Sequence, residues 1–235
     1  MNAVKGYAVY FDSYVPYERA VCIQERLARA RSEEEIPDTV LFLQHPPVVT
    51  LGRRGATENL LVSPENLEEK GIALYRSSRG GDITYHAPGQ LVMYPIIKLG
   101  RAGADAHGHL YNLEETAIRT CADYGVEARR VPRKNGAWTD SGKIAAIGFH
   151  IKRWVTIHGM SFNVDPDLEG FEFIIPCGLH GDPVCSLGSI KGKDTPSIES
   201  VRESMKRRFE EVFERRLDAR TTDQLPDTLR RIWPE

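Results

Sequence analysis

The chain has 235 residues, of which 41% are hydrophobic, and a formal net charge of −2. This size and composition predict one globular domain over residues 1–235, and the small net charge excludes a general attraction to nucleic acid or anionic lipid. The chain has no apolar run near the roughly 18 residues of a membrane span and no signal pattern at its start, so we expect a cytoplasmic protein without a membrane partner.

The N-terminal part of the chain predicts strands and one amphipathic helix. Alternating apolar residues indicate a strand at 7–11, and an apolar stripe with helical spacing indicates a helix at 16–31. Two short apolar strands, 39–43 and 48–51, flank His45, which stands before two prolines. A histidine in that setting is more often a hydrogen-bonded loop residue than a catalyst. We therefore interpret His45 as a support for a nearby site.

The rest of the chain mixes strands and helices without regular alternation. The expected elements, in order, are a helix at 63–70, a strand at 72–75, an apolar segment at 91–99, a helix at 111–124, successive strands within 137–163 and a helix from 195 to about 217. Pro95 interrupts the apolar segment, which is typical of a strand at a sheet edge or of a bulge. This order predicts an α+β fold with a mixed, largely antiparallel sheet flanked by helices.

Residues 79–95, RGGDITYHAPGQLVMYP, combine a cation, paired glycines, a histidine and apolar strand residues. Gly80 and Gly81 allow the backbone to approach a ligand where a Cβ would collide, and His86 is able to transfer a proton or to form a hydrogen bond. The same glycines would also serve an Arg-Gly-Gly turn joined to a hairpin, without a ligand. From this segment alone, both interpretations remain open.

The four cysteines of the chain include no CxxC pair, which argues against a disulfide framework and indicates free thiols. Cys22 and Cys121 fall in helical patterns, where a cysteine usually acts as a small buried hydrophobe. Cys177 lies where an apolar strand meets a proline and a glycine, which makes it a candidate reactive thiol. His107 and His109 suggest a metal site, but no carboxylates or thiols stand in register with them, so we predict a solvated loop and no metal.

Three positions in the strand-rich segment 137–163 have two interpretations each. Lys143 follows a turn at the start of a strand, where a lysine usually protects a sheet edge. Gly148 and Gly159 interrupt strands at places where a missing side chain admits either a ligand or a neighbouring backbone. The residue pattern leaves both roles open at these positions.

Four segments of the chain resemble, in the same order, the lipoyl(octanoyl) transferase family, in full the octanoyl-[acyl carrier protein]:protein N-octanoyltransferases. They are RGGDITYHAPGQ (79–90), GKIAAIGFHI (142–151), HGMSFNV (158–164) and IIPCGL (174–179). The resemblance covers most of the chain from His45 to Leu187. One departure is visible, since Ala87 stands where a glycine is common in the family.

The resemblance implies the fold of the biotin/lipoate protein ligase catalytic domain and an acyltransferase that moves an octanoyl group through a cysteine thioester. It implies octanoyl-acyl carrier protein as the donor and, as acceptors, the lipoyl domains of 2-oxoacid dehydrogenase complexes and the glycine cleavage H protein, without a cofactor. The family's nucleophile falls on Cys177, and the lysine that activates it falls on Lys143. The family's acyl-binding segments fall on Arg79, Gly80, Gly81, Asp82, Ile83, Thr84, Tyr85 and His86, on Ala146, Ile147 and Gly148, and on Gly159, Met160 and Ser161.

The chemistry of these residue types agrees with the implied roles. A cysteine thiol is mostly protonated at neutral pH, so an ammonium group from Lys143 would stabilise the attacking thiolate. An apolar slot that includes Ile83 and Ile147 would bury the acyl tail, which is worth about 5 kcal/mol at ~0.8 kcal/mol per methylene. We expect the acidic carrier protein to dock on a basic patch. Its candidate residues are Arg53, Arg54, Arg129, Arg130, Lys152 and Arg153.

Two other functions compete with this one. An ATP-dependent lipoate or biotin-type protein ligase would share the fold and the Arg-Gly-Gly loop, but it would proceed through an acyl-adenylate and need no cysteine. A non-catalytic module would hold lipoyl domains or acyl groups in the same slot. Cys177 in its PCG setting argues against the ligase, and Cys177 together with Lys143 argues against a binding module.

Overall fold

The computed structural model describes residues 4–100, 106–175 and 182–233 of the chain. Within these residues, eight strands form the main sheet, in which β1 is parallel to its neighbours β11 and β2 and the other neighbouring pairs are antiparallel. In spatial order the strands are β11 (Arg215–Thr221), β1 (Val4–Tyr10), β2 (Asp38–Leu43), β6 (Gln90–Ile96), β10 (Val155–Asn163), β9 (Gly142–Lys152), β8 (Lys134–Thr139) and β7 (Arg129–Val131). This arrangement confirms the predicted α+β fold.

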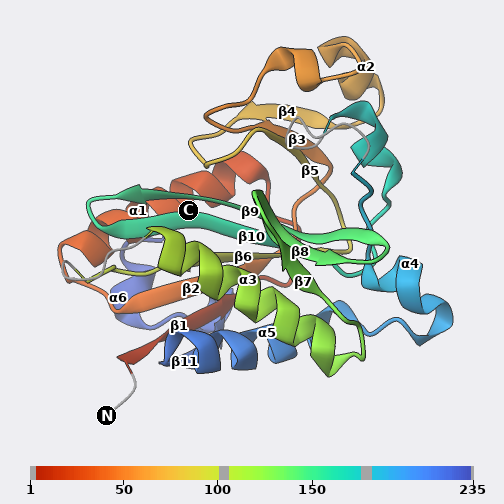
Figure 1. Cartoon of the computed structure of the whole chain (residues 1–235). Helices are drawn as coiled ribbons and strands as arrows, with labels where there is room; N and C mark the ends of the chain where they lie inside the picture. The colour runs from red at the N-terminus through yellow and green to blue at the C-terminus, as the bar shows by residue number, and fades with distance from the viewer. Residues whose placement is uncertain (1–3, 101–105, 176–181, 234–235) are drawn as a thin grey trace.

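A second, smaller sheet stands beside the main sheet and is drawn above it in Figure 1. Its strands are β4 (Ala73–Arg76), β3 (Val48–Leu51) and β5 (Ile83–His86), with β3 in the middle. The sheet has an apolar cluster of its own, in which Leu51 and Ile83 pack with Leu67 of helix α2 (Pro64–Glu69). The sequence pattern predicted strands here but not their separation from the main sheet.

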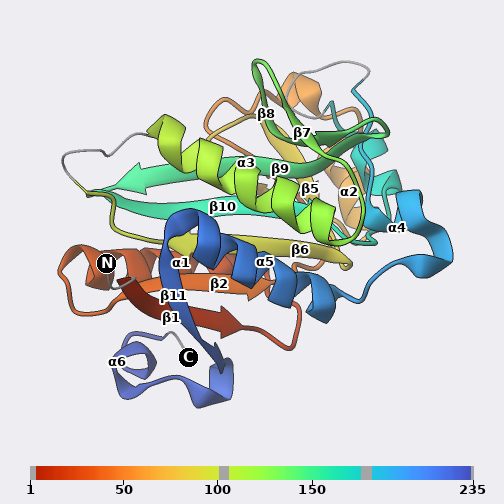
Figure 2. The same cartoon turned by 60° about the horizontal axis from the view of Figure 1, so that its bottom comes forward.

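Helices cover both faces of the main sheet (Figures 1 and 2). Helices α3 (Ala106–Asp123) and α5 (Ile198–Phe213) lie together on one face, and α1 (Tyr17–Ser32) lies on the other. The other described helices are α4 (Leu187–Lys191) and α6 (Asp227–Arg230), with 3-10 turns η1 (Thr57–Asn59), η2 (Glu169–Phe173), η4 (Gly192–Asp194) and η5 (Thr222–Gln224). None of the helices in the described part of the chain is long and apolar enough to cross a membrane.

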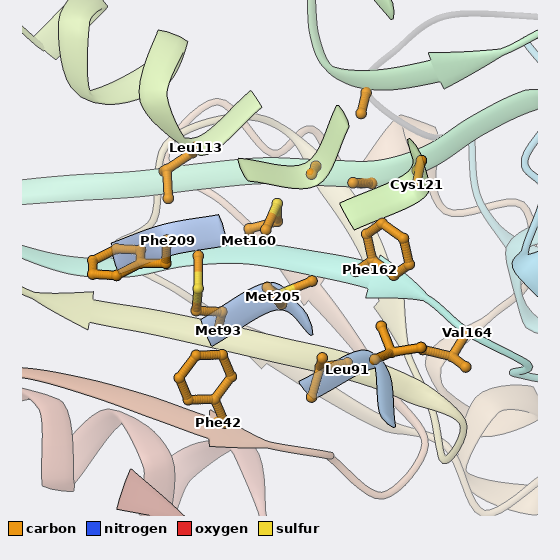
Figure 3. Close-up of a cluster of buried hydrophobic side chains, with 14 of the residues drawn as sticks. Phe42, Leu91, Met93, Leu113, Cys121, Met160, Phe162, Val164, Met205 and Phe209 are labelled. Atoms are coloured by element: carbon orange, nitrogen blue, oxygen red, sulfur yellow. The ribbon is translucent and has the colours of Figure 1, made fainter. Parts of the chain in front are cut away.

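Side-chain alternation along the central strands divides the core between the two faces. On the face of α3 and α5, Phe42 and Met93 belong to the cluster shown in Figure 3. On the face of α1, their neighbours Leu41 and Tyr94 pack in a second cluster that includes Leu27 of α1. Tyr94 also lines the cavity described below, so the α1 side of the sheet continues from the apolar core into the site.

Pro95 lies in β6 between β2 and β10, so the predicted position at a sheet edge is wrong. It is paired with Val40 of β2, whereas the regular pairing of β6 with β10 ends at Met93. Opposite Pro95, β10 carries Gly159, where a Cβ would lie 2.7 Å from the proline ring, and His158, which has φ of 60°. A proline is tolerated at the centre of the sheet because β10 is irregular there.

The segment predicted as a solvated histidine loop is helical. Helix α3 begins at Ala106, so His107 and His109 lie in its first turns. His109 is buried against the ring of Phe149, with centroids 4.7 Å apart, and burial lowers its pKa to about 4. Among the described residues, no group of three or more His, Cys, Asp or Glu side chains is placed to hold a metal ion.

Two further expectations from the sequence are corrected. Helix α5 ends at Phe213, and the left-handed Glu214 (φ 52°) turns the chain into β11, which contains Leu217. Cys22 is exposed rather than buried, whereas Cys121 is buried as expected.

Candidate active site

A cavity of about 420 Å³ is lined by residues of the main sheet, the small sheet and the start of α1. From the main sheet come Ala146 and Gly148 of β9 and Ser161 of β10, and from the small sheet comes Thr84 of β5. The cavity contains most of the predicted site positions. These are Arg79, Gly81, Asp82, Ile83, Thr84, His86, Lys143, Ala146, Ile147, Gly148, Gly159, Met160 and Ser161.

Gly80 and Tyr85 are the predicted site residues in the described segments that do not line this cavity. The ring of Tyr85 packs in the small sheet's own cluster, 5.4 Å from the ring of Phe171. Along β5, Thr84 and His86 are on the cavity side and Tyr85 is on the opposite face. Ile83, at the start of the strand, belongs to the same cluster as Tyr85 but also lines the cavity. Gly80 instead donates its N–H to the carbonyl of Phe149 in β9 (2.9 Å).

Several cavity residues were absent from the predicted acyl-binding segments: Tyr17, Arg54, Tyr94, Arg133, Lys134, Asn135 and His158. Tyr17 and Tyr94 belong to apolar patterns of a helix and a strand, which indicate only burial. Arg133 and Lys134 come from the β7–β8 hairpin, whose polar sequence is typical of any exposed turn. Of the seven, Arg54 belongs to the candidate basic patch and His158 to the family-like segment 158–164, whereas no local signal in the sequence distinguishes the other five from ordinary core or surface positions.

Lys143 is a buried lysine in the cavity wall, with only 6% of its surface exposed. Its strand β9 lies between β10 and β8, so it does not protect a sheet edge. The ammonium nitrogen lies 4.6 Å from the centre of the Trp138 ring, a favourable contact for a cation. On the backbone, Lys143 accepts a hydrogen bond from the N–H of Cys185 (3.0 Å) and donates its own N–H to Pro183 (2.8 Å).

Cys177 lies outside the described residues, but the chain on both sides of it is attached to the cavity wall. Before it, the N–H of Ile175 donates to Asn59 (2.8 Å), whose side-chain amide donates to the carboxylate of Asp82 (2.5 Å). After it, Asp182 forms an ion pair with Lys134 (2.6 Å). Both Asp82 and Lys134 line the cavity.

Arg79 holds the loop before β5 in place. Its guanidinium group is buried and donates hydrogen bonds to the carbonyl of Thr50 (2.6 Å), to the Thr50 hydroxyl (2.9 and 3.0 Å) and to the carbonyl of Gly80 (3.1 Å). The same loop binds the end of β3 through Gly52, which donates its N–H to Asp82 (2.7 Å). Arg79 thus anchors the loop that contains Gly80 and Gly81 to the small sheet.

Close backbone contacts explain the glycines in the cavity wall. A Cβ on Gly148 would lie 2.7 Å from the carbonyl oxygen of Gly80, and one on Gly159 would lie 2.5 Å from that of Met93. Of the two interpretations left open by the sequence, the approach of a neighbouring backbone is therefore real at both positions. Because both glycines also line the cavity, their lack of side chains keeps that space open as well.

Neutral histidines and two tyrosines form a buried polar wall. His45 contacts the carbonyl of Val15 (2.6 Å) with Nδ1 and the Tyr94 hydroxyl (2.8 Å) with Nε2, which confirms it as a hydrogen-bonded loop residue. His158 contacts the hydroxyl of Ser78 (3.0 Å). Burial lowers the pKa of His45 to about 4 and that of His158 to about 3, so both rings are neutral at pH 7.

The proposed basic patch does not form as one surface. Arg130 pairs with Glu114 and Glu115, and Arg129 pairs with Asp140. Lys152 is at the far end of β9 and does not line the cavity. Of the six patch residues only Arg54 lines the cavity, where the other cations are Arg79, Arg133, Lys134 and Lys143.

The chain is similar to known proteins over most of its length. Residues 16–210 match the lipoyl protein ligase A/B catalytic domain. An octanoyltransferase from Geobacter metallireducens is 46% identical over 86% of this chain and 91% of its own length, and one from Caldicellulosiruptor bescii is 44% identical over 92% and 95%. The chain belongs to the octanoyltransferase family. Its members are acyltransferases, so the protein is an enzyme and not a simple binding module.

The solved structures whose fold is similar to that of this chain include lipoate protein ligases. Lipoate-protein ligase A bound with ATP superposes with a TM-score of 0.77 at 17% identity, covering 99% of this chain and 93% of that one. The bipartite lipoate protein ligase of Thermoplasma acidophilum gives a TM-score of 0.73 at 15% identity, covering 98% and 91%. At these identities the likeness shows a shared fold.

The contacts of Arg79 predict a clear difference between two substitutions. Arg79→Lys removes the planar fork that reaches Thr50 and Gly80 together, and we expect it to lower the free energy of unfolding by about 3 kcal/mol. Thr50→Val removes only the hydroxyl acceptor and keeps the carbonyl, so we expect a loss of about 1 kcal/mol. Urea unfolding of the two variants measures this, and equal losses would contradict the anchoring role of Arg79.

Proposed function

We propose that this octanoyltransferase moves an octanoyl group from octanoyl-acyl carrier protein to a specific lysine of lipoyl domains, through a thioester on Cys177. This reaction is the first step of endogenous protein lipoylation. We further propose that the acceptors are the lipoyl domains of 2-oxoacid dehydrogenase complexes and the glycine cleavage H protein. The observation that carries the proposal is a buried lysine, Lys143, in a cavity to which the chain on both sides of Cys177 is attached.

Lys143 supports thiol chemistry through its position and charge. The ammonium group is largely withdrawn from water, where it acts on a nearby thiolate with less screening than at a surface. Residues 183–185 run beside Lys143 through two backbone hydrogen bonds, so only a few residues separate this contact from Cys177. We propose that the ammonium group stabilises the Cys177 thiolate in the first half-reaction.

The proposed reaction has two balanced half-reactions. In the first, the bond from Cys177 Sγ to the acyl carbon forms while the bond to the carrier's sulfur breaks, and the carrier thiol leaves with the proton that the cysteine gave up. In the second, the amine of the acceptor lysine attacks the thioester, an amide bond forms, and the thiol of Cys177 is restored with a proton from the amine. Neither step consumes ATP.

The cavity supports an acyl chain as ligand. Small residues in its wall, Ala146, Gly148 and Gly159, leave room between the two sheets, and Ile83 and Ile147 offer apolar surface. We propose that the octanoyl tail lies there, with the predicted acyl-binding segments 79–86, 146–148 and 159–161 as its surroundings. Gly80 and Tyr85 would act indirectly, by holding the loop and the small sheet in place.

The ATP-dependent ligase is the second candidate function, because lipoate-protein ligase A bound with ATP has the same fold. The high identity to octanoyltransferases over most of both chains favours the transferase. Lys143 is buried beside residues 183–185, which follow Cys177, and its charge would stabilise a thiolate nucleophile. A mechanism through an adenylate has no need of the thiol.

Two broader features are also proposed. We propose that residues 1–235 form a single catalytic domain, because β1 and β11, from opposite ends of the chain, pair with each other in one sheet. We also propose a cytoplasmic location, with which the free thiols of Cys22, Cys121 and Cys185 agree.

Intact-mass analysis tests the proposed function directly. Incubation with octanoyl-acyl carrier protein, without ATP, should add one octanoyl group to the parent protein and none to Cys177→Ser. A lipoyl domain added afterwards should remove that group and gain it. Octanoylation of the acceptor only with ATP and free octanoate would support the ligase instead, and an adduct that persists in Cys177→Ser would exclude Cys177 as the nucleophile.

The cations at the cavity predict how an acidic carrier protein docks. We expect Arg133→Glu, at an exposed position beside the cavity, to raise KM for octanoyl-acyl carrier protein about tenfold at low salt. The loss should shrink at high salt, and an uncharged octanoyl thioester should react unchanged. The matched control is Lys152→Glu, which makes the same charge change away from the cavity. Equal effects of the two variants would contradict docking at the cavity mouth.

A further inference from the structure

A buried chain of hydrogen bonds runs from the backbone beside Lys143 to His86, and its direction is fixed at its start. The carbonyl of Cys185 can only accept, so the amide nitrogen of Asn163 donates to it (2.9 Å). This leaves Asn163 Oδ1 to accept from the amide nitrogen of Gln90 (2.8 Å), which also lies 3.4 Å from the carbonyl of Tyr85. The side-chain oxygen of Gln90 therefore faces His86.

The Gln90 oxygen fixes the tautomer of His86. It lies 2.7 Å from Nδ1 of the ring, and an oxygen that can only accept requires the proton to be on Nδ1. In a neutral imidazole, Nε2 then carries a lone pair and no proton. The ring is neutral at pH 7, because burial, with smaller contributions from His45, Arg79 and His158, lowers its pKa well below the usual value.

This lone pair has no partner among the described residues. His86 Nε2 is buried without a hydrogen bond, although the side chain lines the cavity. A buried acceptor without a donor destabilises the folded state. Such a cost is typical of a site where a ligand completes the bonding.

The other histidines of the wall do not offer the same feature. Both ring nitrogens of His45 have partners. His158 also has a buried nitrogen without a partner, Nδ1, but its other nitrogen contacts a hydroxyl that can either donate or accept, so its tautomer is not fixed. Among these three, His86 is thus the histidine whose unpartnered ring nitrogen is determined by the fold to be an acceptor.

The ligand group that fits this acceptor must bring an N–H or O–H. An octanoyl chain and its thioester have none, whereas the attacking amine of the second half-reaction does. We propose that His86 Nε2 accepts a hydrogen bond from the amino group of the acceptor lysine. This contact orients the lone pair of the amine toward the Cys177 thioester, and the proposal rests on the function proposed above. Gln90 and Asn163 are positioning residues that keep His86 in the acceptor tautomer.

The proton balance of this step needs no additional reactant. As the C–N bond forms, the amine nitrogen becomes acidic and the C–S bond breaks. Because burial disfavours a charged ring, His86 accepts a hydrogen bond from this N–H without taking the proton. The proton ends on the sulfur of Cys177 as that sulfur leaves the acyl carbon.

Separate measurement of the two half-reactions tests the proposal. In His86→Phe, which keeps a flat ring but removes the acceptor, acylation by octanoyl-acyl carrier protein reports any change in the acyl-binding wall, so the readout is the ratio of the transfer rate to the acylation rate. Relative to acylation, transfer from the isolated octanoyl-enzyme to a lipoyl domain should slow by about tenfold, because one hydrogen bond is lost from that step alone. Equal slowing of both half-reactions would overturn the proposal, since it would indicate a contact with the donor or a damaged fold.

A second readout does not depend on activity. In a long-range ¹H–¹⁵N spectrum of the free protein, His86 should show a protonated Nδ1 and an unprotonated Nε2, and Gln90→Met should lose this tautomer and slow only the transfer step. A parent spectrum with the proton on Nε2 would overturn the proposal. If the parent protein forms no octanoyl adduct, the proposed function fails, and the spectrum still decides whether His86 presents an acceptor.

Discussion

The close approach of the 79–82 loop to both sheets is the contact on which the site depends. Gly80 binds β9 of the main sheet through Phe149, and Arg79 binds β3 of the small sheet through Thr50. Together these contacts hold the two sheets at a fixed spacing on either side of the cavity. The glycines at 80 and 148 are required because the backbones meet at distances that exclude a Cβ.

Electrostatics divide the cavity into two regions. Its inner wall consists of buried neutral histidines and tyrosines, whose pKa values are shifted toward the uncharged form by burial. Lys143 provides a buried cation beside this wall, and its backbone is hydrogen-bonded to residues 183 and 185, which follow Cys177 in the chain. A wall of buried neutral groups with a buried ammonium group beside it suits a reaction in which a thiolate and a neutral amine act on an uncharged thioester.

The sequence predicted much of the fold because its strands and helices carry regular apolar patterns. It failed where tertiary contacts decide: Pro95 is central because β10 is irregular opposite it, and α3 begins earlier than predicted because His109 packs on Phe149. The site segments were found through a family resemblance, and the cavity brings most of them together. Tyr17 was missed, since burial in a helix pattern looks the same with or without a ligand beside it.

The tautomer of His86 shows another limit of sequence reasoning. It depends on a contact between Gln90 and Asn163, which are 73 residues apart and which no pattern in the sequence pairs with each other. A crystal structure of the octanoylated protein tests the central claim most directly. The account predicts continuous density from Cys177 Sγ into the space between Gly148 and Thr84, with Lys143 beside the thioester. Density for the chain outside this cavity, or attached to another residue, would contradict it.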